Sequence, residues 1–550
     1  MKVTKLNQIN PNQTSTNPEF KGGGAAFLQY LATNQAVGAN AVDVAFMVVP
    51  RTASDTIRRG PVAGLETGRR EASGTANHTM VGVYGITAGA VIAALMGIDR
   101  NYKTNVNKIM TAPETLNILA ENKALQIKNN KSQREYLEGI LSKVEAFSPQ
   151  SEKASKEGYV KLSDKTIKKV AEHLDKTINE MPKMQKKMFQ KAELTRSIEA
   201  AVNMIIEDTA EQTDVVLRSA SNLPQSKTNL KALVEDICTT SNAFNKDKVK
   251  EAFEKQLKAG KGIAENEFVR RLSKFKNIKS IAGFAIAAGV GMSIQPLNMY
   301  MTKKKTGQDG FVGVEGRTKD TSTGFKVLKC VTSAGFFAMV LGTLHTGLKG
   351  FMDKMAFKGF WPTINQLKGV YGLTIISRLF AARDKDELRE SLTKDTLGFL
   401  SWLVLGDIVN RMTAEALDKS VMDRKSPEVA KKKFLGRAYG SILKTRDEIL
   451  IETLAKNGVS STKEENGKIV AKKFKEMMKD LETISDKEAI KLTKSRIKTL
   501  NKAQLAGYLF SGLVLGLGIP NLNIYITNKL DRKRKAKAAE AEANKISSAA

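Results

Sequence analysis

Long stretches without any charged residue constrain the fold of this chain more than any other feature. Residues 281–302, 330–348 and 503–528 contain no Asp, Glu, Lys or Arg over 22, 19 and 26 positions, although 26% of the whole chain is charged. Residues 80–98 form a fourth window of this kind. A helix that crosses the hydrocarbon core of a bilayer needs about 20 apolar residues. The four windows therefore predict membrane-spanning helices.

A second interpretation of the same windows is that they are buried helices of a soluble protein. They are only moderately apolar, and the mean hydropathy of the whole chain is −0.28. The window at 281–302 contains Pro296, which would normally end a helix in a soluble protein. Glycine and proline are better tolerated in membrane helices, where small residues let backbones approach closely. We therefore favour the membrane interpretation.

The charge balance predicts an anionic partner. The 550 residues include 88 Lys and Arg against 57 Asp and Glu, which gives a formal net charge of +31. Such an excess favours binding to anionic lipid headgroups or to nucleic acid. Nucleic acid is the weaker alternative, because no recognition motif is present and aromatic residues make up only 6% of the chain. We expect a lipid bilayer containing anionic lipids as the main partner, with the charged segments as a surface for a protein partner.

Cysteine and histidine are too few to build a disulfide framework or a metal centre. Cys238 and Cys330 are the only cysteines and lie far apart, which indicates a reducing compartment. With only three histidines, the chain has no spaced His/Cys metal motif. It also lacks the phosphate-binding loop, HExxH, CxxC and EF-hand patterns. We therefore expect no metal, no cofactor and no enzymatic activity.

The apolar windows alternate with Lys/Glu-rich segments whose apolar residues recur at helical spacing. Leu194, Ile198, Ala201 and Ile205, for example, share one face of a helix. We therefore divide the chain into a polar leader at 1–24, apolar segments with an Arg-rich loop at 25–100, a first charged helical insert at 101–279, a proline-broken apolar segment at 280–302, a Gly/Lys loop at 303–329, apolar segments at 330–411, a second charged insert at 412–503, a second proline-broken segment at 504–528 and a basic tail at 529–550.

Sequence matches between the two halves predict an internal duplication. The sequence GVYGIT at 82–87 recurs as GVYGLT at 369–374. The pattern Ala-Gly-aromatic followed by Leu-Asn-x-Tyr-x-Thr occurs at 282–302 and again at 506–527, each time with a proline before the leucine. Ordered repetition indicates a copied structural unit. Four crossings between the two closing segments would make the units parallel, and three would make them inverted.

These observations predict an all-α fold: a multi-pass helical membrane bundle built from two sequence-related units, each with a charged amphipathic helical insert. We expect a protein of the bacterial type in the cytoplasmic membrane, acting in transport, permeation or membrane scaffolding. The alternative is a soluble or peripheral helical protein that binds an anionic partner through lysine-rich surfaces.

Three groups of residues are candidates for a functional site. Ionisable residues inside apolar segments are costly in lipid and therefore mark polar paths, with a structural ion pair or a satisfied core position as the alternative. A proline frees a carbonyl one turn upstream, which a nearby Asn or a ligand can bind, with a packing role as the alternative. An arginine-rich loop would grip anionic headgroups unless it pairs internally with glutamates. The members are, in this order, Asp43, His345, Arg378 and Asp407; Pro296, Asn298, Tyr300, Pro520, Asn523 and Tyr525; and Arg51, Arg58, Arg59, Arg69 and Arg70.

Overall fold

The computed structural model describes residues 35–148, 154–155, 157–184, 188–209, 214–219, 224–307, 319–357, 362–424, 427–523 and a few positions beyond. The polar leader at 1–24, the central part of the Gly/Lys loop and nearly all of the basic tail lie outside the described residues. The chain is 78% helical, which confirms the helical class in its coarse form.

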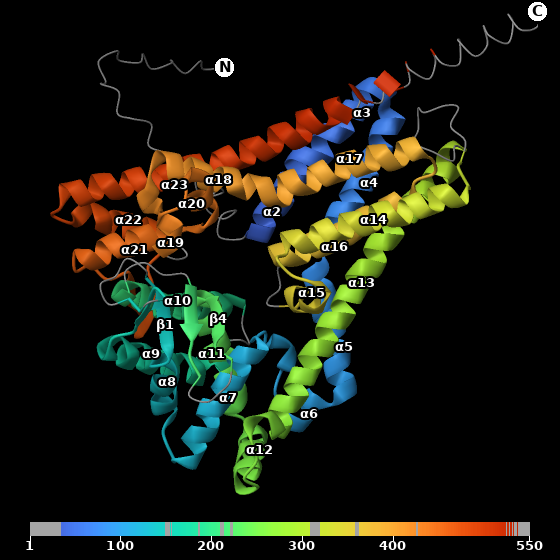
Figure 1. Cartoon of the computed structure of the whole chain (residues 1–550). Helices are drawn as coiled ribbons and strands as arrows, with labels where there is room; N and C mark the ends of the chain where they lie inside the picture. Colours follow the sequence, from blue (N-terminus) through green and yellow to red (C-terminus); the bar gives the residue numbers. More distant parts are fainter. Residues whose placement is uncertain are drawn as a thin grey trace, which may run out of the picture.

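A bundle of long helices forms one part of the molecule (Figure 1). Several of its helices continue through a single π-helical turn into the next segment, and the label η marks these turns as well as short 3₁₀ helices. The elements are α2 (Gln35–Asp43), η1 (Val44–Val48), α3 (Val49–Arg59), α4 (Pro61–Thr79), α5 (Val81–Met96), α13 (Glu267–Thr306), α14 (Thr323–Thr343), α15 (Leu348–Lys354), α16 (Ile364–Ala381), α17 (Lys385–Leu400), η4 (Ser401–Leu405), α18 (Gly406–Leu417), α23 (Lys487–Leu513) and η6 (Val514–Gly518).

The two charged inserts form the other part, at the left and lower left of Figure 1. The first contains α6 (Ile98–Tyr102), η2 (Val106–Lys108), α7 (Pro113–Lys128), α8 (Gln133–Leu141), β1 (Val144–Phe147), β2 (Tyr159–Lys161), α9 (Asp164–Met184), α10 (Met188–Thr209), β3 (Asp214–Leu217), β4 (Ser226–Asn229), α11 (Leu230–Phe244), α12 (Asp247–Lys258) and η3 (Ile263–Glu265). The second contains η5 (Lys419–Val421), β5 (Met422–Arg424), α19 (Pro427–Ala430), α20 (Phe434–Tyr439), β6 (Ser441–Leu443), α21 (Arg446–Lys456), β7 (Thr462–Glu465), β8 (Lys468–Ala471) and α22 (Phe474–Thr483).

The inserts differ from the sequence prediction in three ways. They contain strands: an antiparallel sheet of order β2-β1-β3-β4 in the first insert, and two two-stranded sheets, β5-β6 and β7-β8, in the second. They also end earlier than expected, because Asn266 and Asp486 cap α13 and α23 through their side chains. Finally, they share one hydrophobic core, in which Leu450 and Leu454 of the second insert are buried with residues of the first. The two inserts therefore fold as one domain.

The helices α5 and α16 both pack on α13 and run in opposite directions. Gly85 meets Gly283 on α13, and Gly89 lies beside Lys279, so α5 is antiparallel to α13. On α16, Thr374 contacts Gly291 and Ser377 bonds to Met292, so α16 is parallel to α13. The two copies of the GVYG motif, on α5 and α16, therefore lie on helices of opposite direction.

Four helical segments run from the end of α13 to the end of α23. Lys329 near the start of α14 donates to the carbonyl of Phe380 at the end of α16, and Lys368 near the start of α16 donates to Thr343 at the end of α14. These contacts make α14 and α16 antiparallel. The continuous segment α17–η4–α18 then returns to the inserts, and α23 leads away from them again. In Figure 1, α13 and α23 both run from the inserts toward the upper right corner.

The apolar windows fall on helices that are long enough to cross a bilayer. Three helices qualify by length and composition: Glu267–Thr306, Thr323–Thr343 and the stretch Lys487–Asn523. The pair α4–α5, bent by 48°, adds a fourth if it is one broken span. Only 22–28% of the residues in the three apolar windows are buried inside the protein. These windows are therefore mostly surface, unlike the core helices of a soluble protein.

Candidate functional site

A cluster of ionised side chains lies in the middle of the bundle, centred on Glu71 of α4. Its carboxylate is 3.2 Å from Arg51 Nη1 of α3, 3.5 Å from Arg378 Nη2 of α16 and 3.0 Å from Lys394 Nζ of α17. Arg378 Nη1 is also 3.1 Å from Asp395 Oδ1. The cluster thus joins two pairs of helices, α3–α4 and α16–α17, that are far apart in the sequence.

The members of this cluster are buried almost completely. Side chains of Arg51, Glu71, Arg378 and Asp395 keep 2–7% of their exposed surface, and that of Lys394 keeps 21%. Removing ions from water costs several kcal/mol each, so such a group persists only where opposite charges and hydrogen bonds compensate. Here Glu71 and Asp395 supply the opposite charges for Arg51, Arg378 and Lys394.

A second polar group, built on Asp43 and His78, lies beside the charged cluster. His78 Nε2 is 3.1 Å from Asp43 Oδ2, and the hydroxyl of Thr75 donates to the same oxygen at 2.5 Å. Asp43 and His78 are 2% and 1% exposed. The rings of Tyr371 and Trp402 pack on the imidazole, with centroids 5.6 and 5.2 Å away. An aspartate–histidine pair is thus buried in the bundle, with two aromatic rings packed on its imidazole.

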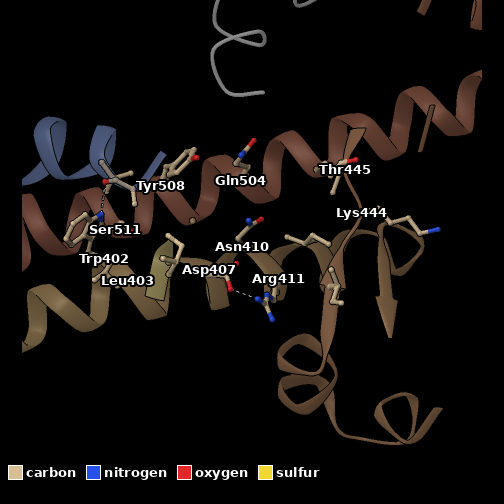
Figure 2. A pocket seen from close by; sticks show the side chains of 18 of the residues that line it. Trp402, Leu403, Asp407, Asn410, Arg411, Lys444, Thr445, Gln504, Tyr508 and Ser511 are labelled. Carbon is tan, nitrogen blue, oxygen red and sulfur yellow. Dashed lines mark hydrogen bonds and ion pairs between the residues drawn. The ribbon is translucent and has the colours of Figure 1, made fainter. Parts of the chain in front are cut away.

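A cavity of about 500 Å³ lies on the far side of Trp402, between the bundle and the second insert. Figure 2 shows Trp402 and Ser511 at one end of it and Lys444 at the other, with Asp407, Asn410 and Arg411 between. Both apolar and polar side chains line it, as is usual for ligand sites of this size. The indole of Trp402 therefore separates the cavity from the imidazole of His78.

The polar side chains of the cavity are paired mainly with each other and with backbone. Arg411 donates to Asp407 at 2.5 Å and to the carbonyls of Tyr439 and Ser441. Asp447, at the start of α21, is half-buried, and its partial removal from water raises its pKa to about 6. The cavity thus presents a carboxyl group that takes up a proton close to neutral pH.

The four ionisable residues predicted to lie inside apolar segments occupy different places in the structure. Asp43 and Arg378 lie in the two buried groups, and Asp407 lines the cavity with about half of its side chain exposed. His345 does not lie within an apolar helix. It follows the end of α14 with φ of +50°, is exposed, and is 2.9 Å from the hydroxyl of Tyr439. The chain leaves α14 there, so this residue marks a helix end.

The prediction of an arginine-rich loop is wrong, because residues 49–79 form the helices α3 and α4. Arg51 is buried and Arg70 is half-buried within the bundle, so neither is freely available to an anionic partner. Arg69 pairs with Glu66 on its own helix, which is the internal pairing named above as the alternative for this segment. The side chains of Arg58 and Arg59 lie outside the described residues, although their backbone is helical.

The two closing segments are also not broken, contrary to the sequence prediction. Helix α13 continues through Pro296, and the helical stretch that begins at Lys487 continues through Pro520 to Asn523. Asn298 binds another helix: its side chain accepts from Arg69 Nε and donates to Ser73, both at 3.0 Å. Tyr300 and Tyr525 are 62% and 63% exposed.

A contact from α16 explains why α13 stays intact at Pro296. A proline inside a helix leaves the carbonyl four residues earlier without its usual donor. Here that carbonyl belongs to Met292, and the hydroxyl of Ser377 donates to it at 2.7 Å. The helix is therefore completed by its neighbour.

This arrangement predicts that the effect of Ser377→Ala depends on Pro296. In the native chain the substitution leaves the Met292 carbonyl without a donor at the contact between two helices, so we expect a loss of about 1–3 kcal/mol in the free energy of unfolding. In a Pro296→Ala background the restored N–H bonds to Met292, and the same substitution should cost clearly less. Denaturant unfolding in detergent micelles measures all four proteins, and equal costs in the two backgrounds would contradict the assignment.

Sequence reasoning missed Glu71, Thr75, His78, Lys394 and Trp402. The signal for the first three was their spacing: positions 71, 75 and 78 recur on one face of a helix. Because a loop was predicted for this segment, its helical spacing was not interpreted as one face of a helix. Within the part of the chain that the structure describes, no group of three His, Cys, Asp or Glu residues is arranged to hold a metal ion. No family model, no curated protein and no solved structure matches this chain.

Proposed function

We propose that the protein is a multi-pass integral membrane protein whose helical bundle moves a small ion across the bilayer along its buried polar centre. The observation that carries this proposal is the inverted burial of α3 and α4. Their charged residues Arg51 and Glu71 are each 4% exposed, whereas Ile57 and Leu65 are 84% and 72% exposed. A soluble helix buries its apolar face, so this pattern favours a hydrocarbon surrounding.

The outer faces of the long helices support the same proposal. Large apolar side chains that are 37–83% exposed follow α5, α13, α14 and α23 on the outside of the bundle. They include Val91, Leu95, Ile281, Ile286, Val290, Met292, Leu297, Val327, Leu328, Val331, Leu505, Leu509, Leu513 and Leu517. Exposed patches of this extent are unusual on soluble monomers and typical of membrane or interaction surfaces. Tyr300 and Tyr525, exposed near the ends of α13 and α23, suit the interfacial position that tyrosine prefers.

A duplicated unit is part of this proposal, with the closing helices as its support. The motif glycine Gly283 of α13 would place a Cβ 2.9 Å from Gly85 Cα, and Gly507 of α23 would place one 2.7 Å from the carbonyl of Gly406. In each half, therefore, the glycine of the Ala-Gly-aromatic motif faces a glycine of the helix that precedes the insert. On this basis α5 corresponds to α18, and α13 to α23. The GVYG match, which would pair α5 with α16, is not part of this correspondence.

The spacing difference between the two copies has a structural reason. Fifteen positions separate Ala282 from Leu297, and sixteen separate Ala506 from Leu522. A π-helical turn holds one residue more than the α-helix around it, and α23 continues into such a turn, η6, between its two motifs. The four segments between the ends of α13 and α23 favour parallel units.

The polar groups follow α4 from the cavity side of the bundle to its other end. His78, Thr75 and Glu71 lie in the centre, and Glu66 and Arg69 contact Asn298 or Thr302 near the lysine-rich end of α13. Ionisable residues inside a membrane bundle commonly mark ion paths and proton relays. A continuous row of polar groups along α4 favours transport over a scaffolding role.

Membrane fractionation and reconstitution test the proposal. We expect the protein to stay with membranes that are washed in high salt and alkaline carbonate, whereas extraction would favour a peripheral protein. In liposomes, we expect flux of at least one of H⁺, Na⁺, K⁺ and Cl⁻ above that of empty liposomes, and a lower flux for Asp43→Asn. Flux of none of the four ions would contradict transport.

A further inference from the structure

We infer that the Asp43–His78 pair is a proton-binding site that the cavity supplies with protons. This inference rests on the proposed function and specifies its ion. The observation is a buried aspartate–histidine contact at 3.1 Å that is separated from a cavity of about 500 Å³ by one tryptophan ring.

The contacts of the pair define which nitrogen takes up the proton. Asp43 Oδ2 accepts from the hydroxyl of Thr75 and needs donors, so the hydrogen of the neutral imidazole belongs on Nε2, which faces that oxygen. His78 Nδ1 then carries a lone pair, and it has no hydrogen-bond partner among the described residues. The buried pair thus has one basic nitrogen left for a proton.

Charged and titratable groups of α3, α4, α16 and α17 lie around the pair. Tyr371 and Arg378 come from α16, Arg51 from α3, and Lys394 and Asp395 from α17, while Arg70 and Glu71 share α4 with His78. The nearest of all to the imidazole is the carboxylate of Asp43, 3.1 Å away. Protonation turns the neutral imidazole and the carboxylate into an ion pair. The added positive charge therefore lies next to the negative charge of Asp43.

In this proposal the proton reaches the site from the cavity across the ring of Trp402. Ala39 and Val42 of α2, on either side of Asn40, line the cavity next to Trp402. Both polar atoms of the Asn40 side chain are buried and have no hydrogen-bond partner among the described residues, and Asn40 lies one turn before Asp43. Asp407 and Asp447 line the same cavity.

The transfer balances without any co-reactant. A hydronium ion in the cavity gives one proton to Nδ1 of His78 and becomes water, and the imidazole becomes imidazolium. The Nε2–H bond stays intact and continues to donate to Asp43. Release of the proton reverses the same step.

Trp402 gives a direct readout of this protonation, because imidazolium quenches the fluorescence of an indole in contact with it. The chain has two tryptophans, so Trp361→Phe leaves Trp402 as the single emitter. In detergent micelles, we expect Trp402 emission to fall as the pH is lowered, along a one-proton curve. Replacement of His78 by Asn should abolish the fall, and Asp43→Asn, which removes the carboxylate that pairs with the imidazolium, should move its midpoint.

A second measurement covers the case in which His78→Asn fails to fold. The chain has three histidines, so ¹³C-histidine labelling gives three NMR titrations, and only that of His78 should shift in Asp43→Asn. An emission that does not change with pH, or a His78 signal that Asp43→Asn leaves in place, would overturn the inference. Because both measurements need no transport, failure of ion flux in liposomes would count against the proposed function and not against this site.

Discussion

Replacing Glu71 by Gln is expected to cause the largest loss of stability of any single substitution in the bundle. The side chain of Glu71 balances Arg51, Arg378 and Lys394, and its neutral analogue would leave three cations with one remaining carboxylate, Asp395. Breaking a buried ion pair typically costs about 3–5 kcal/mol, because the remaining charge stays buried without compensation. Denaturant unfolding in detergent micelles measures the change.

Two further variants serve as controls for this prediction. Glu254→Gln makes the same chemical change at an exposed position of α12 and should leave the stability within about 0.5 kcal/mol. Adding Lys394→Met to Glu71→Gln removes one stranded cation and should restore part of the loss, a coupling that a double-mutant cycle detects. Stability within about 1 kcal/mol of the native protein for Glu71→Gln would contradict the role assigned to the cluster.

The second large effect is expected for Gly283→Ala. A Cβ at this position would lie 2.9 Å from Gly85 Cα and 2.7 Å from the ring of Phe357. Because one of these neighbours is backbone, α5 and α13 must move apart, and overpacking of this kind costs about 1–3 kcal/mol. The equivalent substitution in the second half, Gly507→Ala, should cost about as much, since its Cβ would lie 2.7 Å from the carbonyl of Gly406.

Helix α13 offers a matched control for this comparison. Gly289 lies on the same helix and is exposed, and a Cβ added there would meet none of the described atoms within 4 Å. Gly289→Ala should therefore be neutral or stabilising by up to about 1 kcal/mol, because alanine favours the helix. The two substitutions thus differ in sign. Equal effects at Gly283 and Gly289 would contradict the close packing of α5 on α13.

The sequence predicts the outer surface of the bundle better than its interior. Windows without charge are visible residue by residue, and they coincide with α5, α13, α14 and α23. Asp43 and Arg378 were found because each interrupts an apolar stretch. Their partners were not, since ion pairs between helices that are hundreds of residues apart leave no local pattern.

The arginine-rich segment shows why local signals failed. Gly64 and Gly68 are loop signals by composition, but in the structure they lie against Thr56 and Thr52 of the neighbouring helix. Small residues that let two helices approach closely look the same in a sequence as those that favour a turn. The common core of the two inserts could not be predicted either. In the sequence, its two halves are separated by the whole central part of the bundle.

The reactivity of Cys330 tests the membrane position of the bundle most directly. Cys330 is exposed on α14 and Cys238 is buried in the insert domain. In opened membranes, we expect a membrane-impermeant maleimide to label Ser485→Cys, on the exposed surface of the second insert, and neither native cysteine. Both native cysteines should react after denaturation in SDS. Labelling of Cys330 as fast as that of Ser485→Cys would show that water, and not lipid, covers α14.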